Sequence, residues 1–259
     1  MPDQDLLLVN KEDCICTLTI NRPQKRNSLT RETFTRLDEA LRSAGEDGQT
    51  RVIVLRGAGE KAFSAGYDIS RLSTAEDFDD KDPLEDVILS IEKCAVPVIA
   101  MIYGYCIGAG CGLATACDLR VAADNARLGI TAAKIGMVYP PGATIRLINL
   151  VGVAAAKELL YTGTLVDAGK AGEIGLVDRV APADRLYKVT YDLAREIADN
   201  SPLSVRGNKR IISLLLEHRS NPQLRKEFLA LRKQAAGSRD LEEGARAFSE
   251  KRKPVFTGE

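Results

Sequence analysis

The sequence predicts an α/β core followed by a helical C-terminal region. Two observations lead to this prediction: short β-rich runs alternate with helical patterns in the first half of the chain, and no strand pattern follows about residue 184. A chain of 259 residues is long enough to bury a substantial core. We expect the core to span residues 1–183 and the helical region to span residues 184–259.

Four runs in the first half carry strand patterns. The first alternates with period two, whereas the other three are mainly apolar, which is typical of strands buried in a sheet. The runs are residues 14–20, 51–57, 97–104 and 118–124. Apolar residues recur at helical spacing between Phe34 and Ala44, and Thr30 precedes them as a candidate N-cap. Strands separated by helices favour crossover connections.

The last quarter of the chain carries a succession of amphipathic helical patterns. Residues 184–200 form the first, and Ser201-Pro202 and Asn221-Pro222 are start signals for the next two. A fourth pattern begins at Asp240, with Glu243 at the spacing of a capping box. A helical region of this kind often covers a partner subunit.

The composition excludes several classes of function. Lysine plus arginine and aspartate plus glutamate are equal at 36 each, so no net field attracts nucleic acid or an anionic membrane. No apolar run reaches the roughly 18 residues that a membrane-spanning helix needs, and the first residues lack the build of a signal peptide. The six cysteines match no zinc spacing, which predicts a reduced, cytoplasmic protein without a bound metal.

Two segments rich in small residues follow predicted strands. The first is Ser64-Ala65-Gly66, after which Tyr67 and Asp68 are expected to open a helical turn, with Asp68 as a capping residue. The second, residues 103–118, contains four glycines and leads into a helix. Small residues at such a junction let a ligand approach the main chain, where the first N–H groups of the helix carry positive charge. Neither segment has the spacing of a phosphate loop or a dinucleotide fingerprint.

Five motifs in the chain are informative together. They are NRPQKRNSL (21–29), AFSAGYDI (62–69), GYCIGAGCGL (104–113), LLYTGTLVDAGKAGEIGLVDRV (159–180) and AFSEKRK (247–253). With these motifs the chain resembles the crotonase superfamily of enoyl-CoA hydratases and isomerases, over nearly its whole length. The resemblance implies a spiral of ββα units, a helical C-terminal region that forms trimers or hexamers, and a site for an acyl-coenzyme A thioester.

The same resemblance implies which residues act. The thioester oxygen is expected between the backbone N–H groups of Tyr67 and Ala109, which stabilise an enolate more than the neutral thioester. The implied substrate-binding residues are Lys25, Arg26, Ser28, Ala65, Gly66, Tyr67, Asp68, Ile69, Gly108, Ala109, Phe248 and Lys251. No separate cofactor is implied, because coenzyme A is part of the substrate.

The chain departs from the hydratase pattern at two positions. Hydratases of this family use two glutamates to hold and activate water, and the matching positions here are Gly112 and Ala132. Water addition without a general base loses a contribution of about 10²–10⁴-fold. The sequence therefore favours decarboxylation of a malonyl-type thioester, which generates the enolate without a base, or double-bond isomerisation.

Tyr139 is the best candidate for the proton donor, because the resemblance includes decarboxylases that lack both glutamates and carry a tyrosine there. Tyr67 could also orient a carboxylate or donate a proton, and residues 72–88 are expected to line the acyl pocket. Three alternatives remain open. They are a hydratase with a water held by Tyr139 or Thr131, an acyl-CoA binding protein without catalysis, and RNA binding, which the zero net charge disfavours.

Overall fold

The fold is built on two sheets, seen in a computed structural model that describes residues 5–68, 82–217, 233, 236–252 and 254–255. The larger sheet has the order β1 (Leu7–Glu12), β2 (Ile15–Ile20), β3 (Val52–Gly57), β5 (Val98–Ile102), β7 (Leu119–Ala123), β10 (Arg179–Ala181). Only the β1–β2 pair in it is antiparallel. The smaller sheet has the order β4 (Ala62–Ser64), β6 (Tyr105–Ile107), β8 (Arg127–Gly129), β9 (Val166–Asp167). The four predicted strand runs are confirmed as β2, β3, β5 and β7.

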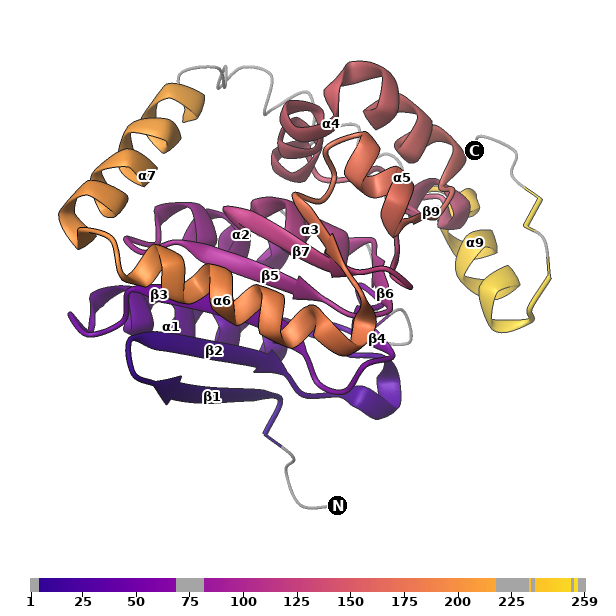
Figure 1. Cartoon of the computed structure of the whole chain (residues 1–259). Helices are drawn as coiled ribbons and strands as arrows, with labels where there is room; N and C mark the ends of the chain where they lie inside the picture. Colours follow the sequence, from indigo (N-terminus) through magenta and orange to yellow (C-terminus); the bar gives the residue numbers. More distant parts are fainter. Residues whose placement is uncertain (1–4, 69–81, 218–232, 234–235, 253, 256–259) are drawn as a thin grey trace.

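Helices cover both faces of the larger sheet (Figure 1). On one face lie α1 (Arg31–Glu46), α2 (Pro83–Lys93) and α3 (Ala109–Ala116), and on the other lies α6 (Leu186–Ala198). Side chains along β3 alternate between the two layers: Ile53 and Leu55 pack toward α1 and α2, whereas Val52 and Val54 pack toward α6. Burial of both faces explains why these strands are apolar throughout.

The two sheets are connected by a repeated unit. Strands β3, β5 and β7 of the larger sheet each continue into a strand of the smaller sheet, β4, β6 and β8 respectively, before the chain enters a helix. Within the smaller sheet β4 pairs parallel to β6, and β6 pairs parallel to β8. The expected spiral of ββα units is therefore confirmed. Its consequence is that the turns after β4, β6 and β8 emerge at the same edge of the smaller sheet.

Five further helical elements of the described chain lie after β8 and matter for the site and the C-terminal region. They are the short 3-10 turn η4 (Ala132–Ile135), α4 (Pro141–Thr162), α5 (Ala168–Glu173), α7 (Pro202–Glu217) and α9 (Arg239–Ser249). The predicted start of α7 at Ser201-Pro202 is confirmed, and the predicted start after Asn221 lies outside the described residues. In the described part of the chain, none of the helices is both long and apolar enough to span a membrane.

Of the N-caps predicted for α1 and α9, the first is confirmed and the second is wrong. Thr30 is the N-cap of α1, and it exchanges hydrogen bonds with Thr33 in a capping box. The prediction for α9 was wrong, because Ser238 is its N-cap and accepts from the N–H of Leu241 at 3.3 Å. Glu243 instead forms ion pairs with Arg246 and Arg252. The helix begins before Asp240, so Ser238 caps its first N–H groups and Asp240 lies within its first turn.

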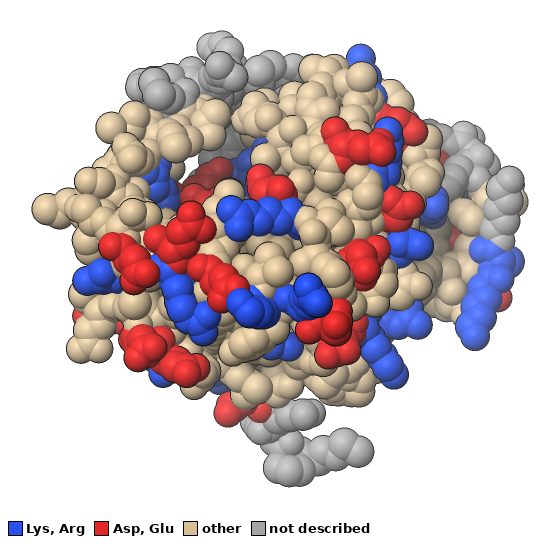
Figure 2. All heavy atoms as spheres, in the orientation of Figure 1, with Lys and Arg blue, Asp and Glu red and all other residues tan. Residues whose placement is uncertain are grey.

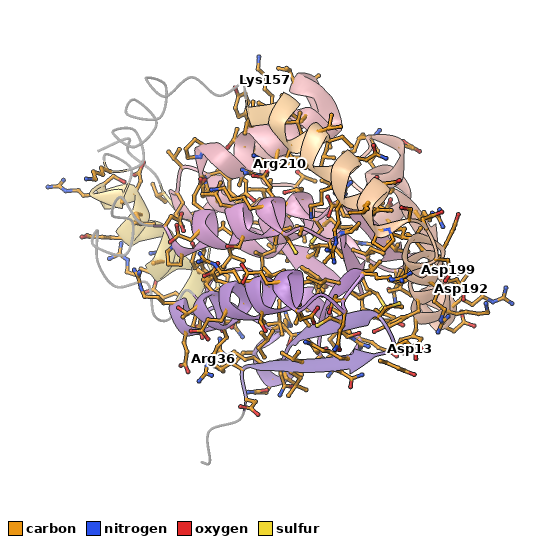
Figure 3. The ribbon with its side chains drawn as sticks, turned by 90° about the vertical axis from the view of Figure 1, so that its left-hand side faces the viewer. Asp13, Arg36, Lys157, Asp192, Asp199 and Arg210 are labelled. Carbon is orange, nitrogen blue, oxygen red and sulfur yellow. The ribbon has the colours of Figure 1, made fainter. Side chains whose placement is uncertain are left out.

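Charge is distributed as the composition predicts. Lysines and arginines are interspersed with aspartates and glutamates over the face shown in Figure 2. Viewed from the side, the labelled charged residues Arg36 and Asp192 lie toward opposite edges of the ribbon (Figure 3). An exception is Lys209 on α7, which is buried and donates to the carbonyls of Ile91 and Val96 and to Asp118. This lysine fixes α7 to the end of α2.

Candidate active site

The turns after β4 and β6 are in direct contact. Parallel pairing of Ser64 with Cys106 brings the two strand ends side by side. A Cβ placed on Gly66 would lie 2.8 Å from the carbonyl oxygen of Ile107 and 3.3 Å from the backbone nitrogen of Ala109. Gly66 also has a φ of +87°, a conformation that favours glycine. Both features require glycine at residue 66. Because Gly66 has no side chain, residues 66–67 can lie directly against the start of α3.

The backbone at Tyr67 is extended, so the predicted helical turn does not begin at this residue, and its continuation beyond Asp68 lies outside the described residues. Tyr67 forms an isolated parallel bridge with Leu29. The N–H of Leu29 donates to the carbonyl of Gly66 at 2.7 Å, and the N–H of Asp68 donates to the carbonyl of Leu29 at 2.9 Å. Successive peptide groups of an extended chain point to opposite sides. The N–H of Tyr67 is therefore directed away from Leu29, and this orientation depends on pairing that no local sequence pattern encodes.

Ala109 is the first residue of α3, and Gly108 is its N-cap. The first N–H groups of an α-helix have no acceptor within the helix and carry the positive end of its dipole. Gly110 lets this helix start pack against β4, because a Cβ there would lie 2.7 Å from the Cβ and the carbonyl oxygen of Ser64. The predicted glycine-rich junction between strand and helix is confirmed at this second turn.

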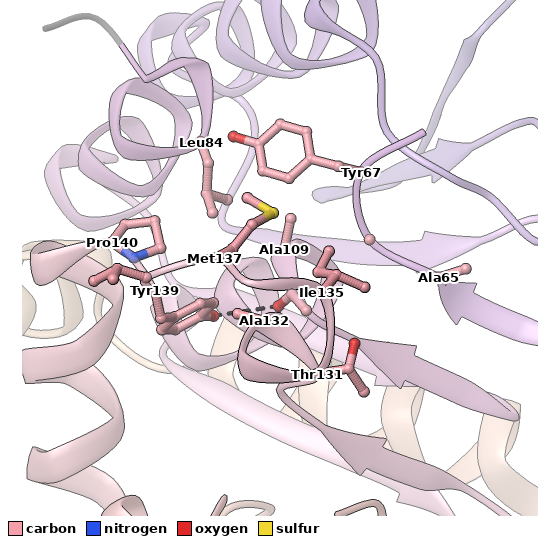
Figure 4. A pocket seen from close by; sticks show the side chains of 13 residues that line it. Ala65, Tyr67, Leu84, Ala109, Thr131, Ala132, Ile135, Met137, Tyr139 and Pro140 are labelled. Atoms are coloured by element: carbon pink, nitrogen blue, oxygen red, sulfur yellow. Dashed lines mark hydrogen bonds between the residues drawn. The ribbon is translucent and has the colours of Figure 1, made fainter. Parts of the chain in front are cut away.

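A pocket of about 60 Å³ opens beside these two turns (Figure 4). Its walls come from the turn after β4, the start of α2, the start of α3 and the segment from η4 to α4. The lining residues are Ala65, Gly66, Tyr67, Leu84, Gly108, Ala109, Thr131, Ala132, Ile135, Met137, Val138, Tyr139 and Pro140. Among these described lining residues, the polar side chains are the hydroxyls of Tyr67, Thr131 and Tyr139, and none carries a carboxylate.

The hydroxyl of Tyr139 occupies the space beside Gly112. A Cβ on Gly112 would lie 2.8 Å from the Tyr139 oxygen, so any larger side chain at residue 112 would displace it. The hydroxyl donates to the carbonyl of Gly108 at 3.2 Å. Burial, and then the neighbouring Cys111 and Cys106, raise the pKa of Tyr139 well above its usual value of about 10. Tyr139 is therefore a neutral phenol at physiological pH.

The side chain of Tyr67 is fixed by α2. Its hydroxyl donates to Asp82, which is the N-cap of α2 and also accepts from the N–H of Leu84 at 2.9 Å. Its ring packs on Phe34, with the ring centroids 5.3 Å apart. Asp82 is only 5% exposed, and it connects the strand that carries the Tyr67 N–H to the helix that carries Leu84.

The segment before α1 is held by a buried network. Arg22 forms an ion pair with Asp68 at 2.8 Å and donates to the carbonyl and the hydroxyl of Ser28. Asp68 is therefore an ion-pair partner within the fold, and the helical turn that it is predicted to cap lies outside the described residues. Asn27 donates to the carbonyls of Ala58 and Ala62, which fixes this segment against β4.

The other predicted substrate-binding residues lie at the surface. Lys25 and Arg26 are exposed, and the Arg26 guanidinium lies over the ring of Tyr105 at 5.6 Å from its centroid. Phe248 is 62% exposed near the end of α9, and Lys251 is exposed just beyond it. Ile69 lies outside the described residues.

Helix α9 packs on η4, which carries Ala132 and Ile135 of the pocket wall. Two glycines permit this close contact. A Cβ on Gly136 would lie 2.7 Å from the carbonyl oxygen of Asp240, and a Cβ on Gly244 would lie 2.6 Å from the carbonyl oxygen of Ile135. The end of the chain therefore supports the pocket from behind η4.

Leu84 lies within residues 72–88, which are predicted to line the acyl pocket, and it does line the pocket. The cap formed by Asp82 is not predicted, although Asp82-Pro83 is a recognisable helix start. The contact between Tyr139 and Gly112 joins residues 27 positions apart, and nothing in the local pattern of either segment indicates it. The glycine at residue 112, where hydratases of this family carry a glutamate, is the sequence signal that another side chain fills this space.

The comparisons with known proteins agree with this geometry. A family model described as enoyl-CoA hydratase/isomerase matches residues 10–259. The chain belongs to the enoyl-CoA hydratase/isomerase family. It is 38% identical to the putative enoyl-CoA hydratase/isomerase YngF of Bacillus subtilis over 98% of both chains, and 33% identical to 2,3-dehydroadipyl-CoA hydratase of Escherichia coli over 97% of this chain and 98% of that one. It is therefore a crotonase-family enzyme that acts on acyl-CoA.

Solved structures of this family extend the comparison. A methylmalonyl-CoA decarboxylase in complex with 2-nitronate-propionyl-CoA superposes with a TM-score of 0.90 at 28% identity, covering 98% of this chain and 99% of that chain. An enoyl-CoA hydratase from Bacillus anthracis has a TM-score of 0.73 at 34% identity, covering 98% of this chain and all of that chain. The predicted fold class and family are both confirmed.

Asp82→Ala tests the link between the strand of Tyr67 and α2. We expect the free energy of unfolding to fall by about 2–4 kcal/mol, because the helix loses its cap and a buried hydroxyl loses its charged acceptor. Asp167 is a matched control, since it caps α5 by accepting from the N–H of Lys170 at 2.8 Å but is exposed. Asp167→Ala should cost about 0.5–2 kcal/mol in urea denaturation. Equal losses in the two variants would show that the Tyr67 contact adds nothing to stability.

Proposed function

We propose that this enzyme decarboxylates a malonyl-type coenzyme A thioester through an enolate. The backbone N–H groups of Tyr67 and Ala109 hold the thioester oxygen. The observation that supports this proposal most directly is the wall of the pocket. Its described residues include no carboxylate, and the phenol of Tyr139 fills the space beside Gly112.

Hydration by the usual route needs carboxylates, and the described residues of the pocket wall include none. The resemblance places the two hydratase glutamates at Gly112 and Ala132. Ala132 lines the pocket, and its methyl group can neither bind nor activate water. Without a general base, addition of water loses a contribution of about 10²–10⁴-fold. The described wall therefore favours a route to the enolate that removes no proton.

Decarboxylation forms the enolate by breaking a carbon–carbon bond. The bond between the α-carbon and the substrate carboxylate breaks, carbon dioxide leaves, and the electron pair moves into the thioester to give the enolate oxygen its charge. Preorganised N–H donors stabilise that charge more than the neutral carbonyl. The apolar wall favours the same step, because an anionic carboxylate is costly in apolar surroundings and carbon dioxide is neutral.

Tyr139 then returns a proton to the α-carbon. Its raised pKa keeps the proton on the phenol before the reaction, and the enolate carbon is a far stronger base than a phenolate. The phenolate regains its proton from water. The donor hydrogen bond from Tyr139 to the carbonyl of Gly108 holds the hydroxyl beside the start of α3, where the thioester lies in this proposal.

The structural comparisons are compatible with this reaction, because a methylmalonyl-CoA decarboxylase superposes with a TM-score of 0.90. Structures described as enoyl-CoA hydratase or hydratase/isomerase superpose with TM-scores between 0.73 and 0.86, so the choice between the two reactions rests on the pocket wall.

The coenzyme A moiety is proposed to lie along the exposed basic residues near both ends of the chain. Lys25 and Arg26 lie within the loop that Arg22 closes by its hydrogen bonds to Ser28, and Arg26 contacts the ring of Tyr105. Phe248 and Lys251 lie at the end of α9, which packs behind the pocket on η4. We also propose that the chain assembles as a homotrimer or homohexamer through its helical C-terminal region.

Gly66→Ala tests the pair of N–H donors. The new methyl group would collide with the carbonyl of Ile107 and press on the nitrogen of Ala109, so it should move the two donors apart. We expect kcat to fall by about 10²–10³-fold, as it does when one oxyanion donor is lost. Gly59→Ala is the control, because Gly59 has a φ of +70° but no atom within 4 Å of the new Cβ. Similar losses of kcat in both variants would point to backbone strain and contradict the proposal.

Tyr139→Phe tests the proton donor. We expect decarboxylation of malonyl-type thioesters in deuterated water to slow by about 10²–10⁴-fold, because the variant has no phenol to protonate the α-carbon of the enolate. Mass spectrometry of a panel of malonyl-, enoyl- and 3-enoyl-thioesters reports decarboxylation, hydration and proton exchange together. If Tyr139→Phe turns over every thioester at the wild-type rate, Tyr139 is not the proton donor. Tight binding of all the thioesters without turnover by the wild type would show a binding protein instead.

The pH dependence of turnover follows from the direction of the pKa shift. A raised pKa keeps Tyr139 protonated to higher pH than a free phenol, so the form that donates persists up to at least pH 10. We expect kcat for decarboxylation to show no decrease due to tyrosine ionisation between pH 7 and about 10. A decrease in that range that disappears in Tyr139→Phe would mean that the phenol ionises at lower pH.

A further inference from the structure

We infer that Leu84 sets the upper limit on the length of the acyl group, so that the site takes short malonyl-type thioesters and excludes long-chain ones. This inference deepens the proposed function, because it rests on the thioester oxygen lying between the Tyr67 and Ala109 N–H groups. Leu84 is the second residue of α2 and lines the pocket across from α3.

The geometry of α3 gives the direction of the acyl group. Ala109 begins the helix, and Gly112 lies three residues later on the same face. At 1.5 Å per residue, Gly112 is about 4.5 Å further along the helix axis. An acyl group that starts at the Ala109 N–H and follows this face has room for the α-carbon and one or two further atoms before it reaches Gly112.

Among the described residues, two side chains fill the space in front of Gly112. A Cβ on Gly112 would lie 2.8 Å from the Tyr139 hydroxyl, and 3.5 and 3.7 Å from the two methyl carbons of Leu84. In Figure 4, Leu84, Tyr139 and Pro140 lie on one side of the pocket, and Ala65 and Thr131 lie on the other. Tyr139 supplies the polar part of this wall, and Leu84 supplies the apolar part.

Leu84 cannot move aside easily. Its side chain is fully buried, and its N–H donates to Asp82, which also accepts from the Tyr67 hydroxyl. Pro83 precedes it at the first position of the helix, where the fixed φ of proline stabilises the helical turn. The distance between the end wall and the Tyr67 donor is therefore held by a chain of hydrogen bonds through one carboxylate.

The test measures binding of saturated acyl-CoA thioesters, which undergo no decarboxylation. Calorimetry with acetyl-, propionyl-, butyryl-, hexanoyl- and octanoyl-CoA should show wild-type affinity falling by at least tenfold between butyryl and hexanoyl. A single methylene in a tight apolar pocket already discriminates by about 10–200-fold. Leu84→Ala should bind hexanoyl-CoA at least tenfold more tightly than the wild type does. Leu84→Met, whose side chain has a similar volume, should bind hexanoyl-CoA as weakly as the wild type.

Leu41→Ala is the matched control. Leu41 is also fully buried in the core that contains Leu84, but it lies on α1 and does not line the pocket. It should lose stability as Leu84→Ala does and still reject hexanoyl-CoA. If Leu84→Ala does not fold, Leu84→Val should shift the same limit by a smaller amount.

Two results would overturn the inference: a wild type that binds hexanoyl-CoA as tightly as propionyl-CoA, or a Leu84→Ala or Leu84→Val variant that folds and keeps the wild-type limit. Failure of the proposed function gives a different result. In that case malonyl-type thioesters are not decarboxylated, while the length limit and its dependence on Leu84 are still measured by binding.

Discussion

The parallel pairing of β4 with β6 is the interaction on which the site depends. It is a short pairing of three-residue strands, yet it places the two following turns so close that Gly66 has no room for a side chain against Ile107 and Ala109. The helices and the larger sheet hold the two strands in the positions that this pairing needs. Strands β3 and β5 deliver β4 and β6 to the same edge, and the buried residues on both faces of the larger sheet keep those strands in register.

Missing side chains shape the chemistry of this pocket as much as present ones. Gly66 and Gly110 let main chain approach main chain, and Gly112 leaves space that a phenol occupies. Around them the walls are mostly alanine, leucine, methionine, isoleucine and proline. Hydrogen-bond donors in such surroundings act in a low dielectric, where each is stronger than in water. A pocket of this kind favours reactions in which charge moves from a carboxylate to an oxygen held by peptide groups.

The sequence predicted the fold class, the four main strand runs, the cap of α1 and the start of α7, because these depend on local periodicity and local caps. It also identified the two turns, since clusters of glycine after strand patterns can be recognised in the sequence itself. The extended conformation of Tyr67 could not be predicted in this way, because Leu29 imposes it from 38 positions away. The ion pair of Asp68 with Arg22 and the role of Asp82 are likewise tertiary, and only Asp82 had a local signal, its position before Pro83.

The contact between Gly112 and Tyr139 constrains how such an enzyme can evolve. A carboxylate side chain at residue 112 and a phenol at residue 139 would claim the same space, because even a Cβ at residue 112 lies 2.8 Å from the phenol oxygen. A single change toward glutamate would displace the phenol, and a single loss of the phenol would leave a void without supplying a base. If the proposed function holds, passage between hydration and decarboxylation therefore requires coordinated changes at residues 112 and 139, in addition to a glutamate in place of Ala132.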